Sequence, residues 1–173
     1  MDYDIREIRE YYDSEIRDYD FNELVGLGVS RENADFMIDI GVPEEFDDFV
    51  FYELNDFKKL LIGEVQFIKI GHKISQYASY GYGLYLKEGE DGLFTSSSFH
   101  HPLVYMLNKN LRTFFLFQLI RWEVSSEMRQ RDIYTSYKYA IELRKLYEQI
   151  DPAALKDVEG YWSHLIEDYE TGL

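Results

Sequence analysis

The chain has 173 residues, of which 46% are hydrophobic and 17% aromatic, which excludes a disordered chain and predicts one compact domain over residues 1–173. Cysteine is absent, which excludes disulfide bonds, a thiol nucleophile and thiolate metal ligands. The formal net charge is −15, which disfavours binding to nucleic acid or to an anionic membrane.

Most of this negative charge lies in the first third of the chain. Residues 1–56 hold 18 acidic and four basic side chains, whereas residues 57–173 hold 15 acidic and 14 basic ones. A local excess of one sign creates a potential that attracts molecules of the opposite charge. The acidic third therefore indicates either a cationic partner or an acidic solvated surface, and composition leaves both open.

The sequence also bears on where the protein works. Its first residues lack the cationic and apolar regions of a signal peptide. The longest apolar stretch, 114–120, is far shorter than the roughly 20 residues that a bilayer span needs. We therefore expect a cytoplasmic protein without a membrane-spanning segment.

Two helices are predicted at the N-terminal end. Apolar residues at steps of three and four predict one amphipathic helix, and these residues are Ile5, Ile8, Tyr12, Ile16 and Tyr19. A shorter helix over 31–39 is indicated by Ser30 as N-cap, Gly41 at its end and Pro43 beyond it. Its predicted buried face consists of Ala34, Met37 and Ile38.

The middle of the chain changes to a period of two, which is typical of strands. The predicted strands cover 49–52, 65–70, 74–77, 83–86, 93–94 and 103–107. Gly71 and His72 are predicted to form a tight turn, and residues 87–92 a longer one. These short strands predict an antiparallel meander of about five or six strands.

Three more helices are predicted after the strands. The first begins with Asn108 or Asn110 as its cap and ends near Met128, with an inner side formed by Leu111, Phe114, Phe115, Phe117, Gln118 and Ile120. The second ends near 151–152, and its predicted face consists of Ile133, Tyr137, Ala140, Ile141, Arg144 and Tyr147. The third covers about 161–169. Helices, then strands, then helices predict an α+β fold in which the C-terminal helices pack on the sheet.

Motifs for cofactors and metals are incomplete in this sequence. Gly26 and Gly28 begin like a dinucleotide fingerprint, but Arg31 stands where the third glycine belongs and no strand precedes them. The adjacent His100 and His101 have no zinc-like spacing to other ligands. We therefore expect neither a cofactor nor a metal.

A calcium-loop pattern also fails. Asp18, Asp20 and Asn22 match its first three ligands, but Glu23 replaces the glycine and Val29 the bidentate glutamate. The helix-end and turn interpretation is therefore preferred.

Nor is a catalytic group indicated. The hydroxyls of residues 95–98 lack a glycine-flanked nucleophile elbow. The acidic side chains of Glu88, Glu90 and Asp91 lie in a turn where nothing would separate their pKa values. The protein is therefore predicted not to be an enzyme, and its function is expected to reside in a surface.

Several local sequences occur in an order that resembles a known family. They are residues 40–43, 68–71, 85–86 with 92–94, 106–114, 150–155, 161–162 and 170–173. Together they are similar to the fourth subfamily of the SUKH superfamily, which consists of bacterial immunity proteins. Lys109 and Asn110 depart from it, since two serines are common there. The resemblance implies structural roles for Pro43 as a helix exit, Asn108 as a cap and Trp162 in packing.

The resemblance implies an immunity protein that binds and neutralises a cognate bacterial toxin by stoichiometric inhibition. The toxins paired with this superfamily are often nucleases or nucleic-acid deaminases, whose substrate sites are basic because they hold phosphates. The alternative is an intracellular regulatory or scaffold module that binds a basic host protein. The identity of the toxin and the oligomeric state stay open.

Two acidic clusters are candidate toxin-binding surfaces. The first consists of Glu44, Glu45, Asp47, Asp48, Glu53 and Asp56. The rival, on the predicted first helix, consists of Asp2, Asp4, Glu7, Glu10, Asp13, Glu15 and Asp18.

Overall fold

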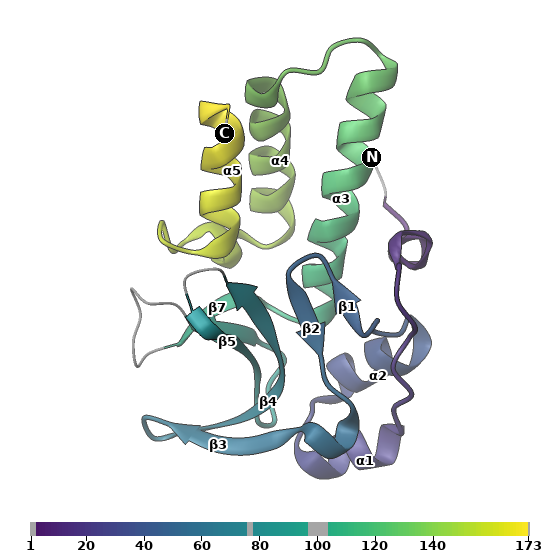
Figure 1. The fold of residues 1–173 in the computed structure, drawn as a ribbon, viewed down its shortest axis with the longest axis vertical. Helices are drawn as coiled ribbons and strands as arrows, with labels where there is room; N and C mark the ends of the chain where they lie inside the picture. The colour runs from purple at the N-terminus through teal and green to yellow at the C-terminus, as the bar shows by residue number, and fades with distance from the viewer. Residues whose placement is uncertain (1–2, 76–77, 97–103, 173) are drawn as a thin grey trace.

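An antiparallel sheet of seven strands is preceded and followed by helices in the computed structural model, which describes residues 3–75, 78–96 and 104–172 (Figure 1). This arrangement confirms the predicted α+β class. The predicted N-terminal pair of helices, in contrast, needs correction.

The first segment is not one amphipathic helix. A short 3-10 helix, η1 (Ile5–Tyr11), ends where Tyr12 takes an extended conformation, and α1 (Phe21–Leu27) begins only after Asp20. Ile5, Ile8 and Tyr19 are nevertheless buried, so the apolar spacing identified core residues but not their backbone. Residues 12–20 form no helix, and residues 14–17 within them pair with another segment, described below.

The second helix, α2 (Arg31–Asp39), begins as predicted, because the Ser30 side chain accepts a hydrogen bond from Asn33 N. Ala34 and Met37 are buried, but Ile38 is 42% exposed, so the predicted face was wrong at Ile38. The buried residues that the prediction missed are Asn33 and Phe36.

The sheet has the strand order β1-β2-β4-β5-β6-β7, with β3 also paired to β4. The strands are β1 (Glu45–Phe46), β2 (Phe49–Phe51), β3 (Lys58–Ile62), β4 (Val65–Ser75), β5 (Ala78–Lys87), β6 (Leu93–Ser96) and β7 (Val104–Asn108). A 3-10 turn, η2 (Leu54–Asp56), precedes β3. The sequence prediction missed β1 and β3, while the predicted turn over 87–92 is confirmed. Two predicted strands extend into residues that the structure does not describe: the strand over 74–77 ends with 76–77, and the strand over 103–107 begins with 103. His100 and His101 also lie outside the described residues.

Gly71 is not in a turn. Two predicted strands are one long strand, β4, which pairs with β3 along its first half and with β2 along its second. Gly71 lies opposite Phe51, where a Cβ atom would stand only 2.1 Å from the carbonyl oxygen of Val50. Glycine is therefore needed for the close approach of β2 to β4.

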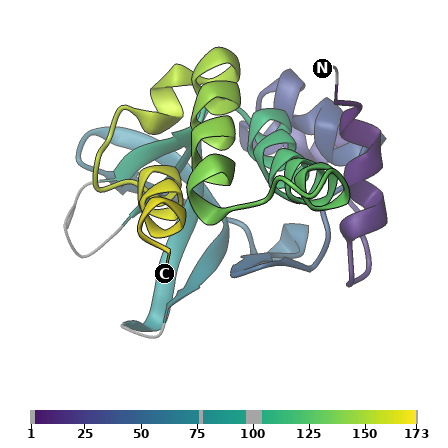
Figure 2. The ribbon, with the colours of Figure 1, turned by 90° about the horizontal axis from the view of Figure 1, so that it is seen from above.

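The C-terminal helices are α3 (Leu111–Gln130), α4 (Ser136–Ile150) and α5 (Tyr161–Thr171), with a 3-10 turn, η3 (Pro152–Leu155), before α5. Asn110 caps α3, since its side-chain oxygen accepts from Thr113 N at 2.8 Å. The predicted inner side of α3 is buried. Seen from above, α5, α4, α3 and η1 lie side by side (Figure 2).

The predicted face of α4 was only partly right. Ala140 and Tyr147 are buried, but the three exposed members are Ile133, Tyr137 and Ile141. Tyr139 and Leu143 are buried instead, so the inward face is rotated relative to the prediction.

Aromatic residues join the helices to the sheet. The ring of Phe114 packs edge-to-face on Phe49 at 4.9 Å between centroids, and Phe115 contacts Phe51 at 5.5 Å. Trp162 is fully buried, as the packing role implied by the resemblance requires. Such ring pairs contribute more to stability than their buried area alone. They therefore stabilise the packing of α3 on β2.

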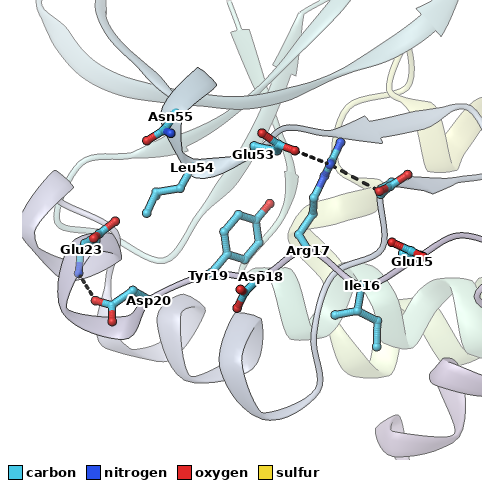
Figure 3. Close-up of a pocket in the computed structure, with 11 residues that line it drawn as sticks. Glu15, Ile16, Arg17, Asp18, Tyr19, Asp20, Glu23, Glu53, Leu54 and Asn55 are labelled. Atoms are coloured by element: carbon cyan, nitrogen blue, oxygen red, sulfur yellow. Dashed lines mark hydrogen bonds and ion pairs between the residues drawn. The ribbon is translucent and has the colours of Figure 1, made fainter.

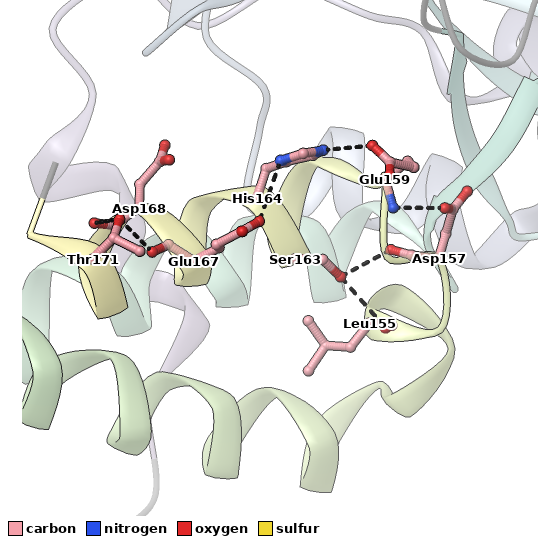
Figure 4. Close-up of polar contacts among 8 residues, drawn as sticks. All are labelled: Leu155, Asp157, Glu159, Ser163, His164, Glu167, Asp168 and Thr171. Atoms are coloured by element: carbon pink, nitrogen blue, oxygen red, sulfur yellow. Dashed lines mark hydrogen bonds and ion pairs between the residues drawn. The ribbon is translucent and has the colours of Figure 1, made fainter.

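The start of α5 is fixed by local polar contacts (Figure 4). Gly160 at the N-cap has no side chain to offer. Ser163 Oγ instead donates to Asp157 O at 2.8 Å, and Glu159 N donates to Asp157 Oδ1 at 3.0 Å. His164 lies between Glu159 and Glu167, at 3.2 and 3.7 Å. These contacts have a structural role in ordering the turn before α5.

Candidate partner-binding face

The extended segment between η1 and α1 pairs with the residues that lead into β1. Arg17 N donates to Val42 O at 2.7 Å, and Glu44 N donates to Glu15 O at 2.8 Å. An isolated antiparallel bridge joins Ile16 to Pro43. Strand pairing thus places acidic residues from the start of the chain beside those near residue 45.

Ser14 extends this pairing by one position. Its hydroxyl donates to Glu45 O at 3.0 Å and accepts from Glu45 N at 2.9 Å. Because side chains alternate along an extended chain, Glu44 and Glu45 face two different grooves, which adjoin along this line of pairing.

We call the carboxylates that line these two grooves the acidic face. They are Glu10, Asp13, Glu15, Asp18, Asp20, Glu23, Glu44, Glu45, Asp47 and Glu53. Arg17 is the one cation lining either groove in the described part of the chain. Four residues from each of the two rival predicted clusters line these grooves, so members of both clusters lie along the same line of pairing.

The remaining predicted residues lie elsewhere. Asp48 and Asp56 line neither groove, and the same holds for Asp4 and Glu7. Asp2 lies outside the described residues. The two clusters therefore meet through the last four members of the first-helix cluster and four of the six members of the other.

The first groove, which we call the arginine groove, has a volume of about 610 Å³ (Figure 3). Arg17 Nη1 lies 3.6 Å from Glu44 Oε1 and 3.5 Å from Glu53 Oε1, while Nε donates to Phe51 O at 2.9 Å. One guanidinium among six lining carboxylates leaves the groove strongly negative.

Tyr19 forms part of the wall of the arginine groove (Figure 3). Its hydroxyl donates to Tyr52 O at 2.6 Å. Burial raises the pKa of Tyr19 well above its ordinary range, against a smaller lowering by Arg17. Tyr19 is therefore a neutral structural wall, and the charge of this groove comes from its carboxylates.

The second groove, the aromatic groove, also measures about 610 Å³. It is lined by Glu10, Tyr11, Asp13, Ser14, Glu45, Phe46, Asp47 and Trp122. The rings of Tyr11 and Trp122 are nearly parallel, with centroids 6.4 Å apart, and the Trp122 side chain is 44% exposed. This groove thus combines exposed aromatic surface with carboxylates.

Tyr11 is held in place by α3. Its hydroxyl donates to Glu123 Oε1 at 2.9 Å. Partial burial, the hydrogen bond and the Glu123 charge raise the pKa of Tyr11 to about 12. The aromatic groove therefore presents a neutral phenol at physiological pH.

Asp47 occupies the tip of the β1–β2 hairpin. Its φ of 56° lies in the left-handed region, which aspartate tolerates better than most residues. Arg121 Nη1 contacts Asp47 Oδ2 at 2.8 Å, and only 12% of the Arg121 side chain is exposed. Asp47 is thus fixed and partly neutralised, whereas Glu45 and Asp48 form no ion pair with any described residue.

The rejected motifs have structural roles. Asp20 caps α1 by accepting from Glu23 N at 2.9 Å, and Gly28, with φ 105°, ends that helix. Glu88 pairs with Lys59 at 2.9 Å, and Glu90 with Lys87. In the described ranges, no group of three His, Cys, Asp or Glu residues has the arrangement of a metal site.

Sequence reasoning missed Trp122 and Arg17. Trp122 stands between Arg121 and Glu123. A tryptophan between two charged residues, on a helix whose other side is apolar, was the signal that could have placed Trp122 on the outer face. No local signal indicated Arg17, because its two acidic partners come from residues far along the chain. The arginine groove therefore depends on contacts between residues that are distant in the sequence.

No helix within the described ranges combines the length and the apolar character that crossing a bilayer requires. Comparisons with protein-family models, with curated proteins and with solved structures found no match.

Proposed function

We propose that this protein is an immunity protein that binds a bacterial toxin with a basic surface and blocks it stoichiometrically. The observation that carries the proposal is the acidic face, in which, among the described residues, ten carboxylates from two distant segments line two adjoining grooves together with a single arginine. A toxin that acts on nucleic acid needs a basic site for phosphates. The acidic face is complementary to such a site.

The resemblance of local sequences to the SUKH superfamily supports the same proposal. It is carried by local sequences between residues 40 and 173, and it implies a packing role for Trp162, which is fully buried. The α+β class alone does not identify a function. The charge and shape of the surface therefore support the choice of partner.

Occupying a basic site requires no chemistry from the inhibitor. The acidic face is held by hydrogen bonds and ion pairs that involve Ser14, Arg17 and Arg121, so little ordering is needed when a partner binds. Complementary charge also raises the association rate. Rapid binding suits a protein that must intercept a toxin before the toxin reaches its substrate.

The experiment is a titration of toxin activity. The genes next to the one for this protein are first searched for a toxin. The candidate toxin domain is then purified, and its activity is measured with increasing amounts of this protein. Stoichiometric inhibition predicts a linear fall to zero at one equivalent and a complex that survives gel filtration. Full activity at several equivalents, or binding only to a basic protein of the host cell itself, would overturn the proposal.

A further inference from the structure

We propose that the aromatic groove receives an arginine or lysine side chain of the partner, and that the arginine groove contributes long-range attraction instead. This inference rests on the proposed function, since the bound side chain belongs to the protein partner. It assigns different tasks to two grooves that adjoin on one acidic face.

The aromatic part of the argument concerns Trp122. The chain has two tryptophans: Trp162 is fully buried, while Trp122 is 44% exposed beside the ring of Tyr11. Tryptophan and tyrosine are enriched among residues that dominate binding energy at interfaces. An exposed tryptophan at the edge of a groove is therefore suited to cover the apolar stem of an incoming side chain.

The charge in the groove specifies a cation. Glu10, Asp13 and Glu45 line it without an ion pair to any described residue. Carboxylates next to aromatic rings favour an ammonium or guanidinium group, which gains both Coulomb and cation–π attraction. An anionic or neutral side chain would gain neither.

The protein already holds one guanidinium in this way. Arg121 Cζ lies 5.6 Å from the ring centroid of Trp122, and Arg121 Nη1 contacts the Asp47 carboxylate. The same ring and hairpin border the aromatic groove. An incoming arginine would therefore repeat, on the exposed side, a combination of contacts that the fold already uses internally.

The arginine groove is less suited to this task. Arg17 lies there between Glu44 and Glu53 and pairs with both carboxylates. It therefore already occupies the place that a cation of the partner would take. Its exposed apolar residue is Ile16, at 38%, which has no ring to stack on a cation. Its remaining carboxylates contribute to the field that steers encounters.

The test uses N-acetyl-arginine amide as the probe, followed by the indole N–H signals of the two tryptophans in NMR spectra. Trp122→Phe assigns the signal of Trp122. We expect the Trp122 signal to shift with the arginine probe, and the Trp162 signal to stay in place. N-acetyl-citrulline amide, which has nearly the same shape but no charge, should cause no saturable shift.

Two triple variants that remove equal charge locate the binding. Glu10→Gln/Asp13→Asn/Glu45→Gln alters the aromatic groove, and Glu15→Gln/Asp18→Asn/Glu23→Gln the arginine groove. We expect the first variant to weaken the arginine probe more than the second. Trp122→Ala, followed by backbone amide signals, should weaken it by about two- to fivefold, as loss of an exposed cation–π contact predicts.

Several outcomes would overturn this inference: an unmoved Trp122 signal, an equal response to citrulline, or equal losses in both triple variants. The probe experiment does not involve a toxin, so its failure is distinct from failure of the proposed function. If Trp122→Ala neutralised the toxin with unchanged affinity, the inference would fall while the proposed function would stand.

Discussion

At the residue scale, Asn108 joins three parts of the C-terminal half. Its Oδ1 accepts from Trp162 Nε1 at 2.8 Å, and its Nδ2 donates to Asp151 Oδ2 at 3.2 Å. Lys109 N donates to the same carboxylate oxygen at 2.8 Å. The sequence allowed Asn108 or Asn110 as the cap of α3, and the resemblance implied Asn108; the structure gives that role to Asn110 and makes Asn108 the centre of a buried network.

Asn108→Ala should therefore destabilise the protein more than Asn110→Ala. The first substitution leaves the buried indole N–H of Trp162 without its acceptor, which costs about 1–3 kcal/mol. The second removes a helix cap, which costs about 1 kcal/mol. Urea unfolding of the two variants measures the difference. Equal or reversed losses would contradict the assignment of the two asparagines.

Residue types predicted some roles in the acidic face and not others. Acidic side chains are visible in the sequence, and Ser30 is predicted as a cap because capping depends on neighbours along the chain. Arg17 could not be placed, because its position between Glu44 and Glu53 depends on tertiary pairing.

At the element scale, the long helix α3 was predictable from the sequence, whereas the pairing of the N-terminal segment with the residues that lead into β1 was not. The helix α3 was predicted from its cap and its buried side. The N-terminal segment has a helical spacing of apolar residues, yet residues 12–20 form no helix, because the backbone of Glu15 and Arg17 bonds to Glu44 and Val42 instead. The helix α1 was missed although Asp20 and Gly28 mark its ends, since the apolar spacing up to Tyr19 predicts a helix over the residues before it.

The strand β4 provides a test of backbone approach. A Cβ at Gly71 would collide with the backbone of β2, whereas a Cβ at Gly26, inside α1, would meet nothing within 4 Å. Gly71→Ala should destabilise by about 1–3 kcal/mol or more through forced separation of strands. Gly26→Ala should stabilise by about 0.5–1 kcal/mol through helix propensity.

Thermal or urea unfolding of both variants measures these effects. A Gly71→Ala protein as stable as wild type would show that β2 and β4 do not approach as described. If Gly26→Ala lowered stability instead, the helical conformation of α1 would be in question.

The packing of α4 on α3 predicts sensitivity to alkali. Tyr147 donates to Phe117 O at 2.8 Å, and Tyr139 donates to Arg121 O. Burial raises the pKa of both phenols above the ordinary value of 10.0. The folded state therefore holds protons that the unfolded chain releases, so stability is fully present below about pH 10 and falls as pH rises through the higher folded pKa.

Above about pH 10, each such tyrosine should lower the free energy of unfolding by up to about 1.4 kcal/mol per pH unit. Tyr147→Phe should reduce this slope. Tyr137→Phe, at a residue on the same helix that is 61% exposed, serves as the control for the loss of a tyrosine hydroxyl. Urea unfolding at several alkaline pH values checks this; equal slopes in all three proteins would contradict the stated burial.

At the scale of the whole molecule, the two acidic clusters act as one surface. The count of charges in the first third was sufficient to predict a locally acidic region. It could not predict that two clusters adjoin, because this follows from the pairing of Ser14 and Glu15 with residues 44 and 45. The described structure therefore replaces two rival locations with a single face that has two grooves.

A field of this kind acts first on the rate of encounter. Complementary charges raise association rates, and the gain falls as salt increases. If the acidic face binds the toxin that we propose as partner, reversing the charge of this face should slow binding far more than reversing equal charge elsewhere. Glu148 on α4 and Asp168 on α5 are exposed and line neither groove, so they provide the matched control.

The most direct test is the association rate of this protein with the toxin, measured by stopped flow over a range of salt concentrations. For Glu15→Lys/Glu45→Lys we predict a rate about tenfold or more below wild type at low salt and a flatter dependence on salt. The control Glu148→Lys/Asp168→Lys should stay close to wild type. Equal rates and salt slopes for wild type and the Glu15→Lys/Glu45→Lys variant would contradict the claim that the acidic face receives the partner.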